Sequence, residues 1–148
     1  MRQTLTIEPL TLNDIGPVSA LEQAAGDVGW SRAQFEKELT MAISRFFVLR
    51  DGPNILGYGG YWKVGDEAQI TNLVIQPEER RRGHGQGLLE NLLERARQEG
   101  CRRATLEVRR RNSTAQILYL KTGFALQGHR PKVYSNPEDD AILMEKYL

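Results

Sequence analysis

The chain has 148 residues, the length of one domain rather than two, with the 40% hydrophobic and 26% charged residues of an ordinary globular protein. No run of about 18 apolar residues occurs, which excludes a membrane-spanning helix, and the N-terminus lacks the apolar core of a signal peptide. The single cysteine, Cys101, excludes an internal disulfide. We therefore expect one domain over residues 1–148, located in the reducing cytoplasm.

The net charge of +1 conceals a basic centre. Residues 80–111 carry ten Arg and four Glu, a balance of +6, whereas the rest carries ten basic and fifteen acidic residues, a balance of −5. This distribution favours one anionic ligand, with a solvated arginine-rich helix face as the plainer alternative. Nucleic-acid binding is not expected, because glycines and a leucine-rich helix interrupt the arginines and no aromatic platform accompanies them.

The beginning of the chain predicts a strand followed by two helices. The strand covers residues 4–8, and the first helix runs from a cap at Thr11 or Asn13 to about Gly26. Ser31 is predicted to cap the second helix. The apolar residues of this helix follow at helical spacing: Phe35, Leu39 and Met41.

A meander of three strands is predicted next, over residues 46–49, 55–64 and 67–75, with turns at 51–54 and 65–66. In the third strand one set of residues alternates with another, so each set is expected on its own face of the sheet. The first set is Ala68, Ile70, Asn72 and Val74, and the second is Thr71, Leu73 and Ile75.

The second half of the chain begins with a polar, glycine-rich loop over residues 76–87. A long amphipathic helix is predicted from Gly87 to Glu99, with Gly100 ending it. There follow a strand over 104–108, a helix over 114–121 capped by Asn112 or Ser113, a strand after the turn 122–124, and a last strand over 141–148. The strand–helix–strand unit over 67–108 implies a parallel pair, so we expect an α/β fold with a mixed sheet.

The loop contains the sharpest motif, Arg82-Gly83-His84-Gly85-Gln86-Gly87. Glycines let a ligand approach the backbone closely, and the start of a helix attracts negative charge, so the motif predicts a phosphate or pyrophosphate site. It is not a P-loop, because no Gly-Lys-Ser/Thr follows, nor the dinucleotide fingerprint, because Leu88 stands where a glycine is needed. A flexible connection with a glycine cap is the alternative.

Arg82-x-x-Gly85-x-Gly87 resembles the Q/R-x-x-G-x-G/A signature of GNAT-superfamily acetyltransferases, and it lies between an apolar strand and an amphipathic helix, as in that family. Leu106-Glu107-Val108-Arg109, followed by Asn112, Tyr119 and Gly123-Phe124, is similar to the ribosomal-protein-alanine N-acetyltransferase subgroup. The resemblance covers nearly the whole chain. It implies a single N-acetyltransferase domain whose mixed sheet has helices on both faces and is splayed open between its fourth and fifth strands.

The resemblance implies acetyl-coenzyme A as co-substrate and no metal. Backbone groups of Leu73, Val74 and Ile75, at a strand edge opened by a bulge, would pair with the pantetheine arm and polarise the acetyl carbonyl. Asn112 would bind the cofactor near the following helix. The pyrophosphate would be bound by the loop residues Arg81, Arg82, Gly83, His84, Gly85, Gln86 and Gly87.

Two residues would carry proton transfer by the same resemblance. Glu107 would be the general base, directly or through a water, although a surface acid paired with an arginine is the alternative. Tyr119 would protonate the departing thiolate, although a core aromatic residue with a solvated hydroxyl is the alternative.

The acceptor side departs from the subgroup. Trp30 and Tyr134 match its substrate-side residues, but Gly29 and Val133 replace a proline and a second tyrosine. The expected acceptor is a protein N-terminal α-amine, that of a ribosomal protein. A lysine side chain or a small amine, and a non-catalytic acyl-coenzyme A sensor, are alternatives. Scattered acids could attract a basic acceptor: Asp27, Glu36, Glu38, Glu138, Asp139 and Asp140.

Overall fold

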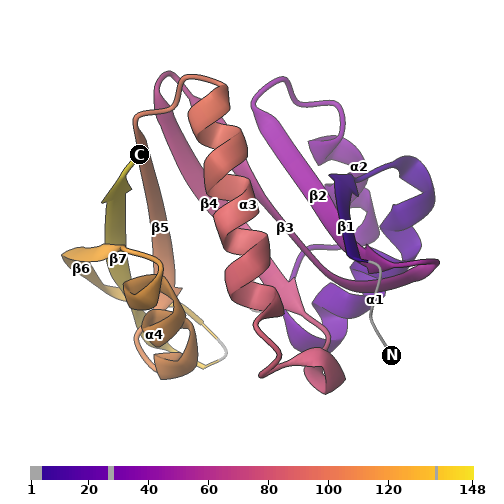
Figure 1. The fold of residues 1–148 in the computed structure, drawn as a ribbon. Helices are drawn as coiled ribbons and strands as arrows, with labels where there is room; N and C mark the ends of the chain where they lie inside the picture. Colours follow the sequence, from indigo (N-terminus) through magenta and orange to yellow (C-terminus); the bar gives the residue numbers. More distant parts are fainter. Residues whose placement is uncertain (1–4, 27–28, 136) are drawn as a thin grey trace.

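The computed structural model describes residues 5–26, 29–135 and 137–148, which form a seven-stranded sheet with helices on both faces (Figure 1). The strand order is β1-β2-β3-β4-β5-β7-β6, and neighbours are antiparallel except for the parallel pair β4–β5. The predicted α/β fold with a mixed sheet is therefore confirmed. The strands are β1 (Leu5–Pro9), β2 (Ser44–Asp51), β3 (Asn54–Val64), β4 (Glu67–Ile75), β5 (Arg103–Arg109), β6 (Ala125–Tyr134) and β7 (Asp139–Tyr147). The helices are α1 (Ile15–Ala25), α2 (Arg32–Glu38), α3 (His84–Gln98) and α4 (Ser113–Lys121), with the short 3-10 helices η1 (Leu12–Asp14) and η2 (Pro77–Glu79).

Side-chain caps set the start of the N-terminal helices. The Asp14 carboxylate accepts hydrogen bonds from the backbone N–H of Thr11 at 2.9 Å and from its hydroxyl at 3.1 Å, where the sequence predicted a cap. The Ser31 hydroxyl oxygen accepts from the N–H of Gln34 at 3.2 Å, as predicted for α2. Met41 lies beyond α2, which ends at Glu38, so its predicted place in this helix is wrong.

Helix α3 begins at His84, three residues before the predicted start. Gly83 precedes it with a φ of +80°, a left-handed conformation that glycine adopts without strain. His84 continues the buried stripe that Leu88 and Leu92 form one and two turns later. The glycines at 85 and 87 therefore belong to the first turn of a helix rather than to a loop.

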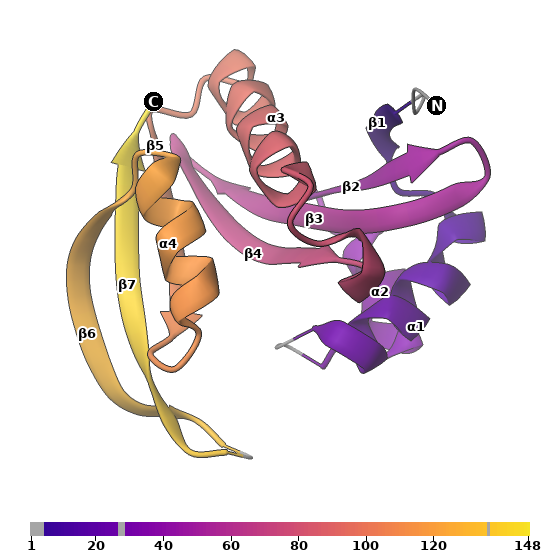
Figure 2. The ribbon, with the colours of Figure 1, turned by 60° about the horizontal axis from the view of Figure 1, so that its bottom comes forward.

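The hydrophobic core has two parts, one on each face of the sheet. Figure 2 shows helix α3 on one face and helices α1 and α2 on the other. On the side that we call the α3 face, leucines of α3 pack against Leu106 and Val108 of β5, and Leu118 of α4 joins them. On the opposite α1 face, α1 and α2 pack against Tyr58 and Val74. The two faces are separated by the sheet itself, so each offers its own approach to the strands.

Strands β4 and β5 pair over only three residues each. Glu67–Gln69 pair with Arg103–Thr105, after which β4 stays hydrogen-bonded to β3 and β5 to β7 (Figure 2). The last residues of β4, 70–75, thus have no partner on the β5 side. This is the predicted opening between the fourth and fifth strands, and it leaves backbone groups of β4 available to a ligand.

A β-bulge at Thr71 changes the faces of β4. Gly60 of β3 is opposite Asn72 and Tyr61 is opposite Ile70, which leaves Thr71 as the extra residue. Ile70 therefore packs on the α3 face, whereas Val74 packs on the α1 face. The prediction that Ala68, Ile70, Asn72 and Val74 share one face is wrong, because one inserted residue reverses the alternation.

None of the described helices is long and apolar enough to cross a membrane.

The single cysteine, Cys101, lies between α3 and β5. Its side chain is 3% exposed, and burial raises the pKa of its thiol.

Candidate active site

The segment before α3 has the backbone geometry of an anion site. Arg81 and Gly83 adopt left-handed conformations, with φ of +64° and +80°. Alternation of handedness along a segment turns successive N–H groups toward a common concavity, and non-glycine residues accept such strain mainly at functional sites. The N–H groups of residues 84–86 open α3 and have no carbonyl partner within the helix, while the helix dipole adds partial positive charge.

Two residues of the predicted loop, His84 and Gly87, lie in the first turn of α3. The N–H of Gly87 donates to the carbonyl of Gly83 at 3.0 Å, so this donor is used inside the helix. The side chain of His84 is 9% exposed and its Nε2 is buried, without a partner among the described residues. His84 can therefore offer a ligand its backbone N–H. Gly87 has no free N–H to offer, but its lack of a side chain leaves room for a ligand.

Most of the polar side chains of residues 80–86 donate hydrogen bonds to nearby residues of the same chain. Arg82 donates to Glu79 at 2.9 Å, and Arg80 donates weakly to the carbonyl of Ile75 at 3.4 Å. Gln86 donates to Glu90 at 3.0 Å. The exposed side chain of Arg81 makes no hydrogen bond or ion pair with another residue of the described ranges, which leaves its charge to the solvent or a ligand.

Gly85 is the point where three elements of the site meet. A Cβ at this position would lie 3.4 Å from Leu118 Cδ2 on α4 and 3.7 Å from Ile75 Cγ1 at the end of β4. The next residue on α4, Tyr119, is half-buried and packs edge-on against Phe124, with ring centroids 5.9 Å apart. The predicted loop, the open end of β4 and helix α4, which carries the predicted acid Tyr119, therefore converge on the α3 face.

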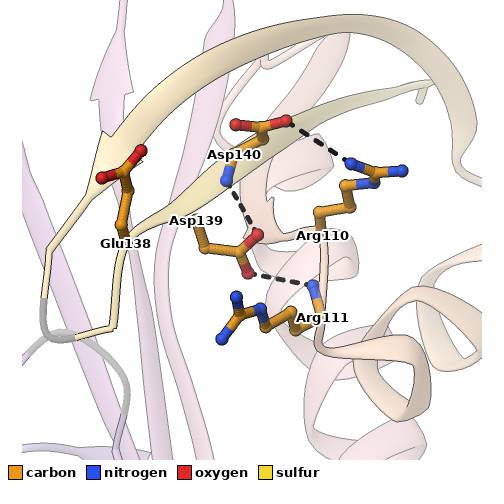
Figure 3. Close-up of a pocket in the computed structure, with 5 residues that line it drawn as sticks. All are labelled: Arg110, Arg111, Glu138, Asp139 and Asp140. Carbon is orange, nitrogen blue, oxygen red and sulfur yellow. Dashed lines mark hydrogen bonds and ion pairs between the residues drawn. The ribbon is translucent and has the colours of Figure 1, made fainter.

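Asn112 caps α4, since its side-chain oxygen accepts from the N–H of Ala115 at 3.1 Å. Arg110 and Arg111, in the segment before it, form a surface pocket with Glu138 and the start of β7, drawn in Figure 3. Asp139 accepts from the N–H of Arg111 at 3.0 Å, and Asp140 lies 3.7 Å from Arg110. These acids join the start of β7 to the segment before α4. Of the acids expected to attract an acceptor, Asp139, Asp140, Glu36 and Glu38 already have partners, and Asp27 lies outside the described residues.

Glu107 lies on the α1 face, because its neighbours Leu106 and Val108 pack on the α3 face. Its Oε1 accepts from Nη1 of Arg130, two strands away, at 2.6 Å. The alternative of a surface acid paired with an arginine therefore describes its contacts. The pair remains open to solvent, since 40% of the Glu107 side chain and 58% of the Arg130 side chain are exposed.

Trp30 and Tyr134, the two residues predicted to contact the acceptor amine, lie at different places in the fold. Trp30 packs against Phe35 and Phe46, with ring centroids 5.5 Å apart in each case, and is half-buried. Tyr134 ends β6, and the Arg109 guanidinium lies over its ring at 4.3 Å. Trp30 therefore belongs to the edge of the core on the α1 face, and Tyr134 lies beside Arg109 at the end of β6.

Sequence reasoning missed a buried polar chain on the α1 face. Asn72 donates to the Tyr58 hydroxyl at 3.3 Å, Tyr58 donates to Glu22, and the other oxygen of Glu22 accepts from the N–H of Gly29 at 2.6 Å. Burial and the adjacent Glu22 carboxylate raise the pKa of Tyr58 far above its usual range. The one sequence signal was a glutamate on the apolar face of a predicted helix, four residues after Val18.

Comparison with known proteins shows the family to which this chain belongs. Residues 17–124 match the model of the acetyltransferase (GNAT) family. The chain therefore belongs to this family, whose members use acyl-coenzyme A, and it is a GNAT N-acetyltransferase of the type EC 2.3.1. The resemblance identified from the motifs is confirmed.

Relatives extend over nearly the full chain. It is 30% identical over 141 residues to the [ribosomal protein bS18]-alanine N-acetyltransferase of Escherichia coli K12, covering 94% of this chain and 95% of that protein. It is 32% identical over 150 residues to the N-alpha-acetyltransferase RimI of Mycobacterium tuberculosis, covering 97% and 93%. The crystal structure of the E. coli ribosomal-protein-S18-alanine N-acetyltransferase superposes with a TM-score of 0.89 at 29% identity, covering 97% and 94% of the two chains.

Proposed function

We propose that this chain transfers the acetyl group of acetyl-coenzyme A directly to the α-amine at the N-terminus of a protein, with a ribosomal protein as the acceptor. The observation that carries the proposal is the opening beside β4. The loop before α3 and helix α4, which carries Tyr119, lie on its α3 face, and Glu107 of β5 lies on the α1 face. Similarity to a [ribosomal protein bS18]-alanine N-acetyltransferase and to an N-alpha-acetyltransferase supports the choice of acceptor.

The coenzyme A pyrophosphate would bind on the α3 face, at the loop before α3. The N–H groups of residues 84–86 and the charge of Arg81 would hold its oxygens, and a ligand can approach closely because Gly85 has no side chain. Backbone groups of residues 73–75, which lack a β5 partner, would pair with the pantetheine arm and hydrogen-bond the thioester oxygen. Asn112 would add a contact at the start of α4.

The amine would enter from the α1 face, past Trp30 and Tyr134. Glu107, directly or through one water, takes the proton that the amine loses as its nitrogen bonds to the acetyl carbon. The carbon–sulfur bond breaks, and Tyr119 gives its hydroxyl proton to the thiolate. The thioester supplies the acetyl group, so no acyl-enzyme is needed.

A transfer assay with mass spectrometry tests the proposal. The panel holds a peptide with the N-terminal sequence of ribosomal protein bS18, the same peptide with a blocked N-terminus and a free lysine, and a polyamine. We expect the acetyl group on the α-amine of the first peptide and little transfer to the other two. Preferred transfer to the lysine or the polyamine would contradict the acceptor, and no transfer to any amine would contradict the function.

A further inference from the structure

Asn72 lies in the part of β4 that has no β5 partner, and one atom of its buried amide is unused. Its side chain is 3% exposed, its Nδ2 donates to Tyr58, and its Oδ1 has no partner among the described residues. Buried amide oxygens are almost always hydrogen-bonded. An unpaired oxygen on a strand whose edge is open is a candidate acceptor for a donor from outside the described residues.

The orientation of this amide is set by Glu22, two hydrogen bonds away. Glu22 is 1% exposed, and its two oxygens accept from the N–H of Gly29 and from the Tyr58 hydroxyl. Because a carboxylate has no hydrogen to donate, the Tyr58 hydroxyl hydrogen points at Glu22 and its oxygen accepts from Asn72. The NH₂ group of Asn72 is thereby directed to Tyr58, and its oxygen is turned away.

The backbone makes room for this buried carboxylate. A Cβ at Gly26 would overlap the carboxylate oxygens of Glu22. The φ of Gly26 is −86°, a value open to any residue, so glycine is needed here for close approach and not for a turn. Gly26, Glu22, Tyr58 and Asn72 thus form a complementary set that runs from the end of α1 to the open part of β4.

The bulge at Thr71 decides which ligand the Asn72 oxygen can meet. It turns Asn72 to the α1 face, the face of Glu107, while its neighbour Leu73 turns to the α3 face, the face of the anion site. The oxygen is therefore on the side of the amine and not on the side of the pyrophosphate.

We propose that Asn72 Oδ1 accepts a hydrogen bond from the amino group of the acceptor amine, and that Glu22 is a positioning residue acting through Tyr58. The inference rests on the proposed amine N-acetyltransferase function. A neutral amine attacks with its lone pair and keeps N–H bonds that point backward, where an acceptor can hold them. A neutral amide oxygen suits this role because, unlike a carboxylate, it adds no full charge that would favour the unreactive ammonium form.

The first test is Asn72→Leu, a change of similar size that removes both amide groups. With the acceptor peptide as the varied substrate, we expect KM to rise about tenfold, the usual effect of one lost hydrogen bond, while acetyl-coenzyme A affinity measured by calorimetry stays the same. Unchanged peptide KM would overturn the proposal. Weakened acetyl-coenzyme A binding with unchanged peptide KM would also overturn it, since the oxygen would then serve the cofactor.

The second test, Glu22→Gln, keeps the size and the acceptor for Gly29 but adds a donor facing Tyr58. The Tyr58 hydroxyl can then reverse and donate to Asn72, whose amide turns its NH₂ group to the ligand. We expect a rise in peptide KM comparable to that of Asn72→Leu, and no further rise in the double variant. A lowered melting temperature with unchanged KM would reduce Glu22 to a structural residue.

Glu38→Gln is the matched control. Glu38 is also buried, at 5% exposure, and accepts hydrogen bonds from Trp62 at 2.7 Å and Ser44 at 3.0 Å, both away from the open part of β4. Its substitution should lower the melting temperature and leave peptide KM unchanged. A wild-type chain that acetylates no amine contradicts the proposed function itself, whereas an active chain with unchanged KM in the Asn72 and Glu22 variants contradicts only this inference.

Discussion

Arg130 on β6 and Glu107 on β5 form a hydrogen-bonded ion pair across the intervening strand β7, with 2.6 Å between Nη1 and Oε1. Both side chains are more than a third exposed, and such pairs contribute about 0–1 kcal/mol because water screens them. Glu107 therefore has little stability to lose, and a large effect of its substitution on activity would have to come from chemistry.

Glu107→Gln keeps the size of the side chain and removes its basicity. We expect turnover to fall by about 10²-fold or more, with residual activity that rises with pH as more of the amine arrives neutral. The melting temperature and the affinity for acetyl-coenzyme A should barely change. The pH–rate profile and thermal unfolding of the same preparation measure both effects.

Arg130→Gln is the control for that prediction, because it breaks the same ion pair from the other side. It should retain most of the turnover with a similarly small change in melting temperature. If the two variants instead lose activity equally, and only in proportion to unfolded protein, Glu107 is a structural residue.

Gly85→Asp should abolish cofactor binding without harming the fold. A Cβ here meets ordinary contact distances at Leu118 and Ile75, and an acid in the first turn of α3 interacts favourably with the helix dipole. The carboxylate would, however, repel the pyrophosphate. Calorimetry should give no measurable affinity for acetyl-coenzyme A in Gly85→Asp and reduced but measurable affinity in Gly85→Ala. Unchanged affinity in a folded Gly85→Asp variant would place the cofactor elsewhere.

Tyr119→Phe should lower turnover by about 10²- to 10⁴-fold if the hydroxyl is the general acid. The ring and its contact with Phe124 remain, so the loss of stability should stay within about 1–2 kcal/mol. Tyr147→Phe, at a tyrosine that is 78% exposed on β7, should change neither quantity. Normal turnover in Tyr119→Phe, with chemistry shown to limit the rate, would leave Tyr119 a packing residue.

Asp14 should make stability sensitive to acid. Burial raises the pKa of its carboxyl, but hydrogen bonds from Arg50 and Thr11 outweigh burial and lower the pKa below its usual value of 3.8. Because the folded pKa is the lower one, Asp14 stabilises the fold above the unfolded pKa and loses this contribution as pH falls through the folded pKa.

Urea unfolding at about pH 7 and about pH 3 tests this linkage. Asp14→Asn should be less stable than wild type at the higher pH, and the difference should shrink at the lower pH. The exposed Asp66 provides a control, since Asp66→Asn should give a small difference at both. A difference between Asp14→Asn and wild type that does not depend on pH would show that the hydrogen bonds do not favour the ionised form.

Local patterns predicted most of the elements and the parallel pair, because strand alternation and helix caps depend on near neighbours. Ser31 and Asn112 cap α2 and α4 as expected. The start of α3 was misplaced because glycines disfavour helix interiors, whereas the first turn tolerates them when tertiary contacts bury His84 and Leu88.

Features set by distant strands could not be predicted. The Thr71 bulge depends on the register between β3 and β4, and no single-strand pattern reveals it. The partner of Glu107 is Arg130 rather than its strand neighbour Arg109, because cross-sheet contacts decide it. Asn72 appeared in one alternating set with Ile70, whereas the bulge places the two on opposite faces and directs the Asn72 amide to Tyr58.

The buried position of Cys101 allows turnover to be measured through the free thiol of the product. It is the single thiol in the sequence, it is 3% exposed, and its pKa is raised, so the folded protein should react slowly with thiol-specific dyes. Each acetyl transfer releases one molecule of free coenzyme A, which reacts with such dyes at once. A colorimetric thiol assay can therefore follow turnover continuously against a nearly silent protein, and a slow later increase in colour would report unfolding of the enzyme in the same cuvette.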